Sequence, residues 1–181
     1  MKSTEILNGL QVSLTINRLC FQLIENHNDF SSSVLIGLQP NGIFLANRLK
    51  NSLQDSINNK VSVGSLDITF FRDDFRRKEK PLIPSVTNID FSIENKKVIL
   101  VDDVFFTGRT VRSALDAIMT FGRPSSVEFL TLIERRFVQN IPIKADYIGR
   151  SIDTIKEEKV SVLWKEEHGK DQILLHSPIL K

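Results

Sequence analysis

The sequence predicts an α/β fold in which helices flank a parallel β-sheet. Two kinds of segment support this prediction. Short continuous apolar runs are typical of strands buried on both faces, and they alternate with segments whose apolar residues recur every three or four positions, as in amphipathic helices. Because strands that alternate with helices usually form a parallel sheet, the fold class follows from the order. At 181 residues, with no repeat and no linker, the chain fits one domain over 1–181.

The expected elements follow one another along most of the chain. The run SVLIGL reads as a buried strand, and QPNG breaks it before the next helix. A later helix stops at Gly122, with Pro124 beyond it. The expected helices are 10–26, 43–53 and 110–122, and the expected strands are 33–38, 61–71, 97–101, 126–133, 159–164 and 172–176.

Composition excludes several classes of protein. The 24 Lys and Arg residues nearly balance the 22 Asp and Glu residues, so the net charge gives no global sign of nucleic-acid binding. The single cysteine, Cys20, excludes an internal disulfide framework, fits a reducing compartment and falls in the apolar pattern of the first helix. There is no signal-peptide pattern and no apolar run of about 18 residues. We therefore expect a cytoplasmic protein without a membrane partner.

The segment VILVDDVFFTGRT (98–110) joins a buried strand to a helix. Two adjacent carboxylates stand at the carboxyl end of the strand, where open α/β sheets bind ligands. They can accept hydrogen bonds from a vicinal diol and can favour a nearby cation. The following turn offers backbone N–H groups, two hydroxyls and a helix N-terminus to a phosphate. Its glycine allows close approach. The expected ribose-5-phosphate site comprises Asp102, Asp103, Val104, Phe105, Phe106, Thr107, Gly108, Arg109 and Thr110.

Two other interpretations apply to the separate halves of this segment. A strand that ends in Asp-Asp also occurs at Mg²⁺ sites of the Walker-B and response-regulator kinds, and the turn alone can serve as a helix cap. The sequence contains no G-x-x-x-x-G-K-[ST], which removes most support for a P-loop protein. The combination of diol and phosphate features favours ribose-phosphate binding.

VILVDDVFFTGRT resembles the signature of type I phosphoribosyltransferases, which bind 5-phosphoribosyl diphosphate. The segments LDITFFRDD (66–74), GRPSSVEFL (122–130), IPIKADYIGRSI (141–152) and EEKVSV (157–162) extend this resemblance to the PyrR family over nearly the whole chain. PyrR proteins are pyrimidine operon attenuation regulators that also carry uracil phosphoribosyltransferase activity. The resemblance implies a small hood, formed by roughly 134–160 with parts of the tail, over the sheet. It also implies a homodimer or larger homo-oligomer.

The implied reaction is uracil plus phosphoribosyl diphosphate giving UMP plus diphosphate. Asp102 and Asp103 would be the catalytic residues, because their charge would stabilise an oxocarbenium-like transition state, as in glycoside cleavage. The cofactor Mg²⁺ would be held mainly by substrate diphosphate oxygens, with few protein ligands. No dedicated metal site and no dedicated general base are therefore expected.

Two loops are expected to handle the diphosphate. The family reads Lys-Thr-Arg-Gly after its first core strand, whereas this chain has Gln39-Pro40-Asn41-Gly42 and so lacks both cations. A plain strand-to-helix turn is the alternative interpretation of this loop. RDDFRRKEKP (72–81) resembles the mobile loop that closes over the site and excludes water. Its basic residues either replace the missing charge or belong to a solvated loop; the residues assigned to this loop are Arg72, Arg76, Arg77 and Lys78.

Recognition of the base is expected to follow the last core strand. The family shows Asp-Arg-Gly-His-Arg there, and this chain has ERRFV at 134–138. By resemblance, Arg135 and the backbone of Val160 contact the base. A nucleotide-sensing, RNA-binding regulator of pyrimidine genes is the alternative function, and Arg18 on the first helix matches one position of the family's RNA-binding pattern. A nucleotide-binding homologue with weak or lost catalysis is a third interpretation.

Overall fold

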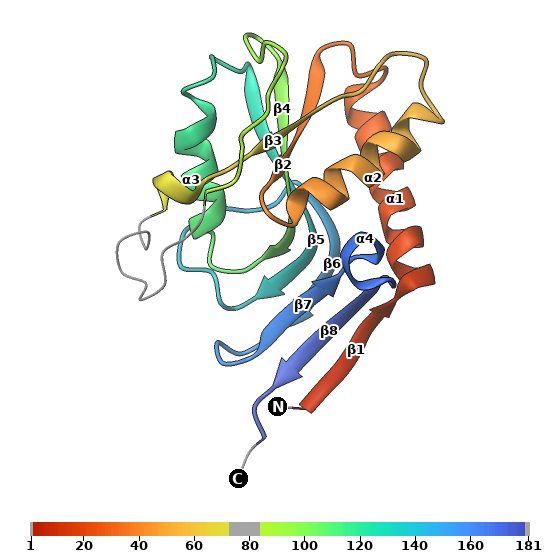
Figure 1. The fold of residues 1–181 in the computed structure, drawn as a ribbon, viewed down its shortest axis with the longest axis vertical. Helices are drawn as coiled ribbons and strands as arrows, with labels where there is room; N and C mark the ends of the chain where they lie inside the picture. Colours follow the sequence, from red (N-terminus) through yellow and green to blue (C-terminus); the bar gives the residue numbers. More distant parts are fainter. Residues whose placement is uncertain (1, 73–83, 180–181) are drawn as a thin grey trace.

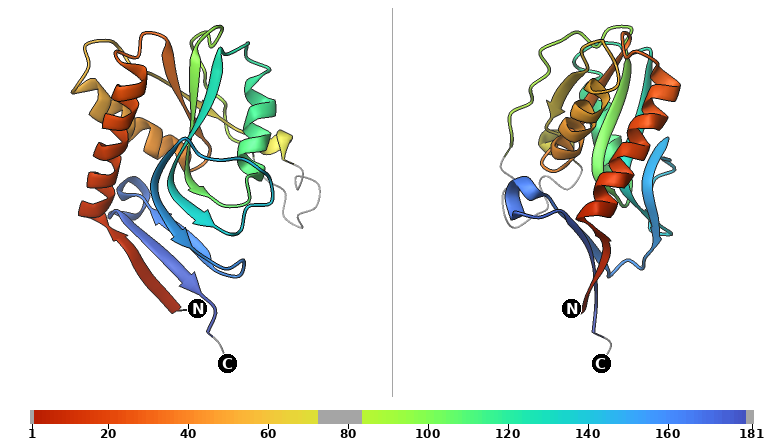
Figure 2. Two further views of the ribbon diagram at one scale, coloured as in Figure 1. Left: turned by 180° about the vertical axis from the view of Figure 1, so that it is seen from behind. Right: turned by 90° about the vertical axis from the view of Figure 1, so that its right-hand side faces the viewer.

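The protein is described by a computed structural model that covers residues 2–72 and 84–179. Helices α1 (Gly9–His27) and α2 (Gly42–Gln54) cover one face of the central sheet, and α3 (Arg109–Ile118) covers the other (Figures 1 and 2). All four strand pairs of this sheet are parallel, as predicted. In spatial order the strands are β3 (Ser62–Leu66), β2 (Ser33–Leu38), β4 (Lys97–Phe105), β5 (Ser126–Arg136) and β6 (Tyr147–Asp153).

The two middle strands explain why their sequences are continuously apolar. Along β2, Leu35 belongs to the core beneath α1 and α2, whereas Ile36 belongs to the core beneath α3. Along β4, Ile99 and Leu100 divide between the two cores in the same way. Because successive side chains of a strand point to opposite faces, a strand covered on both faces needs apolar residues at every position.

A second, three-stranded antiparallel sheet lies beyond the carboxyl ends of β4 and β5 (Figure 1). Its order is β1 (Lys2–Asn8), β8 (Gln172–Ser177) and β7 (Lys159–Leu163), and the single-turn helix α4 (Lys165–His168) follows β7. We call this sheet with α4 the hood. The expected hood segment, 134–160 with parts of the tail, includes the start of β7 but also residues of β5 and β6, which lie in the central sheet. Val160, Val162 and Trp164 join the core that underlies α1 and α2.

Two strands were not predicted because their sequences lack a strand pattern. The side chains of β1 are mostly exposed, so KSTEILN gives no apolar alternation. In β6, the sequence YIGRSID carries a glycine and charges because this strand is the edge of the central sheet. Both strands are specified by their partners, β8 and β5, rather than by local pattern.

The three largest boundary errors lie at the ends of β3, β4 and α3, and the strand expected to end at 133 also continues to Arg136. The strand expected to end at residue 71 ends at Leu66, because the Asp67 carboxylate accepts hydrogen bonds from the Thr69 N–H and hydroxyl and begins a short 3₁₀ turn. The helix expected to reach Gly122 ends as an α-helix at Ile118 and continues in turns. The strand expected to end at 101 continues to Phe105, so the paired aspartates lie within it.

The prediction for Cys20 is confirmed. Its side chain is buried in the core with α1, and burial raises the pKa of the thiol to about 11. In the two described stretches, 2–72 and 84–179, no helix is long and apolar enough to cross a membrane.

Candidate functional site

The site is built around the end of β4, where Asp102 and Asp103 lie on a strand that is buried on both sides. The Oδ1 atom of Asp102 accepts a hydrogen bond from the N–H of Asp103 at 3.0 Å. Only 8% of the Asp103 surface is exposed. Behind them, the fully buried Thr131 of β5 accepts from the Phe105 N–H and donates to the Ile133 carbonyl, which fixes the backbone after the aspartates.

Burial dominates the electrostatics of this carboxylate pair. Desolvation raises the pKa of Asp102 well above its usual range, the charge of Asp103 raises it further, and Arg72 partly opposes both effects. Desolvation also raises the pKa of Asp103, while the hydrogen bond from Asn41 opposes that rise. Ionisation of these two carboxyls therefore costs free energy in the folded protein, as expected at a site where a cationic group arrives during binding or reaction.

The predicted phosphate turn follows β4 directly and opens α3. Gly108 has a φ of 87°, in the left-handed region that favours glycine, and it is the N-cap of α3. The Arg109 N–H points toward the Thr107 hydroxyl at 3.5 Å. The first N–H groups of a helix have no partner within the helix, so this end of α3 presents donors and the positive end of the helix dipole to an anion.

The predicted diphosphate loop packs against β4. A side chain at Gly42 would overlap the carbonyl oxygen of Val101, so only glycine allows α2 to begin this close to β4. The Nδ2 atom of Asn41 donates to Oδ2 of Asp103 at 3.0 Å. Gln39 precedes a cis peptide bond to Pro40, and its side-chain amide donates to the Val86 carbonyl. The polar side chains that replace the family's cations are thus both engaged with the protein.

The predicted mobile loop is described only at its edges. Arg72 lines a cavity together with Asp102. On the far side, Asp67 accepts from the Ser85 N–H, and the Asp67 N–H donates to the Thr87 hydroxyl, so the chain that returns from this loop is fastened to the end of β3. Arg76, Arg77 and Lys78 lie outside the described residues.

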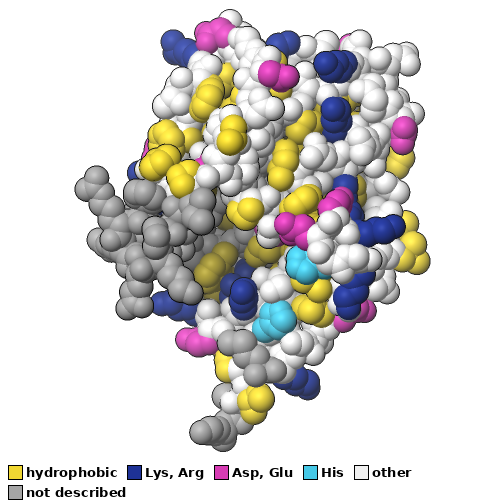
Figure 3. Space-filling view, in the orientation of Figure 1, with side chains coloured by type: hydrophobic (Ala, Val, Ile, Leu, Met, Phe, Trp, Pro, Cys, Tyr) yellow, Lys and Arg dark blue, Asp and Glu magenta, His cyan; other side chains and the backbone are white. Residues whose placement is uncertain are grey.

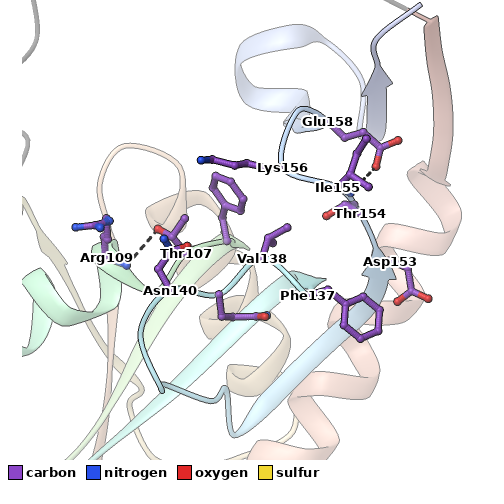
Figure 4. A pocket seen from close by; sticks show the side chains of 12 residues that line it. Thr107, Arg109, Phe137, Val138, Asn140, Asp153, Thr154, Ile155, Lys156 and Glu158 are labelled. Carbon is purple, nitrogen blue, oxygen red and sulfur yellow. Dashed lines mark hydrogen bonds between the residues drawn. The ribbon is translucent and has the colours of Figure 1, made fainter. Parts of the chain in front are cut away.

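Three cavities meet around these elements. One of about 260 Å³ lies over the phosphate turn and Asp102. Another, of about 370 Å³, lies between the diphosphate loop, with Asn41 and Asp103, and β7 of the hood. The third, of about 970 Å³, lies between the phosphate turn and two loops, 137–140 and 153–158 (Figure 4). In Figure 4, Thr107 and Asn140 lie on one side of this third cavity and Lys156 reaches toward it from the other.

The two predicted base-contacting residues occupy different positions. Val160 lines the cavity that also contains Asn41 and Asp103. Arg135 is buried and donates to the Thr154 hydroxyl and the Ile155 carbonyl, at 3.0 and 2.9 Å. Its guanidinium lies 3.9 Å from the centre of the Phe106 ring. Arg135 thus joins the loop after β6 to Phe106, the residue that follows β4, and its direct contact with a base stays a prediction.

Several lining residues were missed by sequence reasoning. Gln139 and Asn140 follow β5, and Thr154, Lys156 and Glu158 belong to the loop between β6 and β7. The stretch DTIKEEK reads as an ordinary charged surface loop. The available signal was its overlap with EEKVSV (157–162), one of the segments that resemble the PyrR family.

The described residues contain no group of three or more His, Cys, Asp or Glu side chains arranged to hold a metal ion. Asp102 and Asp103 supply oxygen atoms, which are the ligands that Mg²⁺ prefers. The donor set therefore fits a Mg²⁺ ion that is held mostly by substrate oxygens and water.

Comparison with known proteins identifies the family. The model of the phosphoribosyl transferase domain matches residues 2–167. The chain is 39% identical over 177 residues to the bifunctional protein PyrR of Desulfosudis oleivorans, covering 98% of both chains. It is 42% identical over 171 residues to the bifunctional protein PyrR of Gloeothece citriformis, covering 94% of this chain and 96% of the relative.

The chain belongs to the phosphoribosyltransferase family. Within it, the chain is a member of the PyrR family, as the sequence predicted. Among solved structures it resembles a hypoxanthine phosphoribosyltransferase from Staphylococcus aureus, with a TM-score of 0.66 at 19% identity, over 83% of this chain and 77% of that one. This likeness establishes the fold of a type I phosphoribosyltransferase: a central parallel sheet flanked by helices.

The buried carboxylates of this phosphoribosyltransferase should reduce its stability above acidic pH. A carboxyl whose pKa is raised by folding contributes stability below its unfolded pKa of about 3.9, and that contribution is lost as pH rises through the raised value. We expect Asp102→Asn to raise the free energy of unfolding by about 0.5–2 kcal/mol at pH 7 and to change little near pH 3.5. Denaturant unfolding at both pH values measures this. An equal gain at both would contradict it.

Proposed function

We propose that the protein transfers the phosphoribosyl group of 5-phosphoribosyl diphosphate to uracil, giving UMP and diphosphate. The observation that carries this proposal is the pairing of two buried carboxylates on β4 with the phosphate-binding turn at the start of α3. The two features are four residues apart and border one cavity, which Asp102 and Thr107 both line. A ribose 5-phosphate carries hydroxyls, which suit the carboxylates, and a phosphate, which suits the turn.

In the proposed reaction, N1 of uracil forms a bond to the anomeric carbon of the ribose while the bond from that carbon to the diphosphate oxygen breaks. The N1 proton of uracil is lost, and the diphosphate leaves with the bonding electron pair. Positive charge develops on the ring before the new bond is complete. The residues of the site contribute by holding the ring and by stabilising that charge.

Asp102 and Asp103 supply the electrostatic part of this catalysis. Each carboxylate has two oxygen atoms with several acceptor positions, so a ribose hydroxyl can bind beside the hydrogen bonds that the protein donates to them. Their burial makes the charge more effective, because the attraction between charges grows as the local dielectric falls. Mg²⁺ bound to the diphosphate would neutralise charge on the leaving group.

The base is proposed to lie between the central sheet and the hood. Val160 lines the cavity on the diphosphate side, and the loops at 137–140 and 153–158 line the larger cavity beyond Phe106. Arg135 supports this wall from behind by fixing Thr154, Ile155 and Phe106 relative to one another. Positioning of the two reactants by separate parts of the protein is itself a large source of rate enhancement.

A radiolabelled uracil assay with phosphoribosyl diphosphate and Mg²⁺, run beside guanine, hypoxanthine and orotate, tests the proposal. We expect UMP formation, and we expect Asp103→Asn to lower turnover about 100-fold or more, because one preorganised charge is lost as the ring becomes cationic. The affinity for substrate should change much less. No product with any base, or normal turnover with only a raised Michaelis constant, would contradict the proposed role.

The altered diphosphate loop offers a second test. Replacing Gln39-Pro40-Asn41 by Lys-Thr-Arg restores two cations, and a charge-assisted contact is worth about 1.5–3 kcal/mol. Activity should rise about tenfold or more, while UMP affinity, which involves no diphosphate, should stay nearly constant. Because Asn41 also donates to Asp103, Asn41→Ala is the matched control that removes this hydrogen bond alone. If the triple replacement changes neither the turnover number nor the rate constant for diphosphate release, the loop does not contact the leaving group.

A second candidate function is regulation through pyrimidine-operon RNA, which the PyrR relatives' description as bifunctional favours. On the outer side of α1, Phe21 is 64% exposed and lies one turn from Asn17 and Arg18. An exposed aromatic ring beside a cation suits stacking and phosphate contact with single-stranded RNA. The Arg18 guanidinium also donates to the carbonyls of Ile148 and Gly149, which fixes its place on the surface.

For this second function, we expect weak RNA binding that is lost as salt increases and that falls about fivefold or more in Phe21→Ala, with UMP formation unchanged. A gel-shift titration at two salt concentrations measures it. RNA affinity that is equal in the wild type and the variant would remove this face of α1 from the RNA site. A homodimer or larger assembly remains part of the same proposal, and sedimentation of the protein in solution tests it.

A further inference from the structure

Arg48, in the second turn of α2, binds two carboxylates with both sides of its guanidinium: Glu166 in α4 of the hood and Asp171 just before β8. Its Nε and Nη2 atoms donate to the two oxygens of Glu166 at 3.0 and 2.7 Å. Its Nη1 and Nη2 atoms donate to the two oxygens of Asp171 at 2.8 and 2.6 Å. Paired, parallel hydrogen bonds of this kind fix orientation as well as distance. We call these three residues the Arg48 clamp.

Arg48 is less exposed to solvent, and the clamp makes more contacts, than is usual for a surface ion pair. The Arg48 side chain is 21% exposed and lies 4.7 Å above the ring of Trp164, which is fully buried. Asp171 also accepts from the Lys165 N–H at 2.8 Å and so holds the start of α4. Partial burial alone would lower the pKa of Arg48, but the hydrogen bonds from Arg48 to Asp171 and Glu166 raise it above its usual value, and the same contacts lower the pKa of both carboxyls.

The two elements that the clamp joins both reach one cavity, α2 through Asn41, the residue before its start, and α4 through Glu167 and His168. The helix α2 begins at Gly42, directly after Asn41, which lines the cavity of about 370 Å³ together with Asp103. The cavity is also lined by β7 and by Glu167 and His168 in α4. Figure 3 shows Lys, Arg, Asp, Glu and His side chains gathered on the lower part of this face of the molecule. The clamp therefore connects the two elements that reach this cavity without lining the cavity itself.

We propose that Arg48 is a positioning residue, which acts through α2 to set the distance between the central sheet and the hood so that a nucleotide can contact both. This role rests on the proposed function, because it assigns the base to the hood and the ribose phosphate to the central sheet. Arg48 lines none of the three cavities described above. Its influence passes through α2 on one side and through Asp171 and α4 on the other.

The chemistry makes this distance important. The ribose 5-phosphate turn and the carboxylates belong to β4 and α3, which the clamp does not touch. A ligand that consists only of ribose and phosphate is therefore held by the central sheet alone. UMP, and the two substrates together, span the central sheet and the hood, and misplacement by about 1 Å in such an arrangement can cost about 100-fold in rate.

The test compares three variants of the complete protein. Arg48→Met removes the charge and keeps most of the aliphatic length, and Arg48→Lys keeps the charge without the paired geometry. Arg112→Met is the matched control, because Arg112 forms an exposed ion pair with Asp116 on α3, on the opposite face of the sheet. Calorimetry with ribose 5-phosphate and with UMP measures each affinity, and hydrogen exchange of residues 159–171 measures the opening of the hood.

For Arg48→Met we expect a loss of UMP affinity of about tenfold, ribose 5-phosphate affinity within twofold of the wild type, and hydrogen exchange at 159–171 at least tenfold faster, with β4 and β5 unchanged. Arg48→Lys should recover part of the UMP affinity, and Arg112→Met should match the wild type. In the assay, turnover should fall more than the affinity for phosphoribosyl diphosphate.

Three results would overturn the proposal. Equal losses for both ligands would indicate general destabilisation. Unchanged UMP affinity with unchanged hydrogen exchange would mean that the clamp positions nothing. If the wild type itself binds neither ligand, the proposed function fails and the positioning role fails with it, and faster exchange in Arg48→Met would then identify the clamp as a purely structural contact.

Discussion

The site depends on the parallel pairing of β2 with β4. In this register Gly37 lies opposite Val101, so both strands deliver their following residues to the same edge of the sheet. Loop 39–42 and the carboxylate pair are about sixty residues apart in sequence, yet a side chain at Gly42 would meet the backbone of β4. Because parallel strands must be joined by a crossover, α2 has to begin at this edge, and its first turn becomes part of the site.

This close approach determines the electrostatics. Helix α2 on one side and β5 on the other exclude water from Asp103, and the Asn41 amide is the neighbouring donor that the protein provides. An amide at that position adds no charge of its own, and Arg72 opposes only part of the cost that burial imposes on the pair. A carboxylate pair that is buried in this way attracts a cationic ring or a metal ion more strongly than an exposed pair would, which is a common arrangement where electrostatic effects contribute to catalysis.

Sequence reasoning predicted the parts of the molecule whose pattern is local. The middle strands are buried on both faces, so the continuous apolar runs SVLIGL and VILV were enough to predict them. The turn at Gly108 was recognised from the Thr-Gly-Arg-Thr sequence that follows the strand. Strands β1 and β6 were not predicted, because each is specified by a partner strand and not by its own sequence pattern. The Arg48 clamp was not predicted for the same reason: the two carboxylates that Arg48 binds are 118 and 123 residues away from it in sequence, and no local pattern relates them. The role of Arg135 was predicted by alignment, but its burial beneath Phe106 depends on tertiary packing.

The pairing of β1 with β8 has a consequence for synthesis of the chain on the ribosome. Residues 2–8 leave the ribosome long before their strand partner, Gln172–Ser177, and β7 needs the same partner. The central strands β2, β3 and β4 have all their neighbours by residue 136, whereas β5 still lacks β6. A nascent chain can therefore assemble most of its central sheet well before its hood, while β1 remains an unpaired strand edge, which is the kind of surface that invites pairing with another chain.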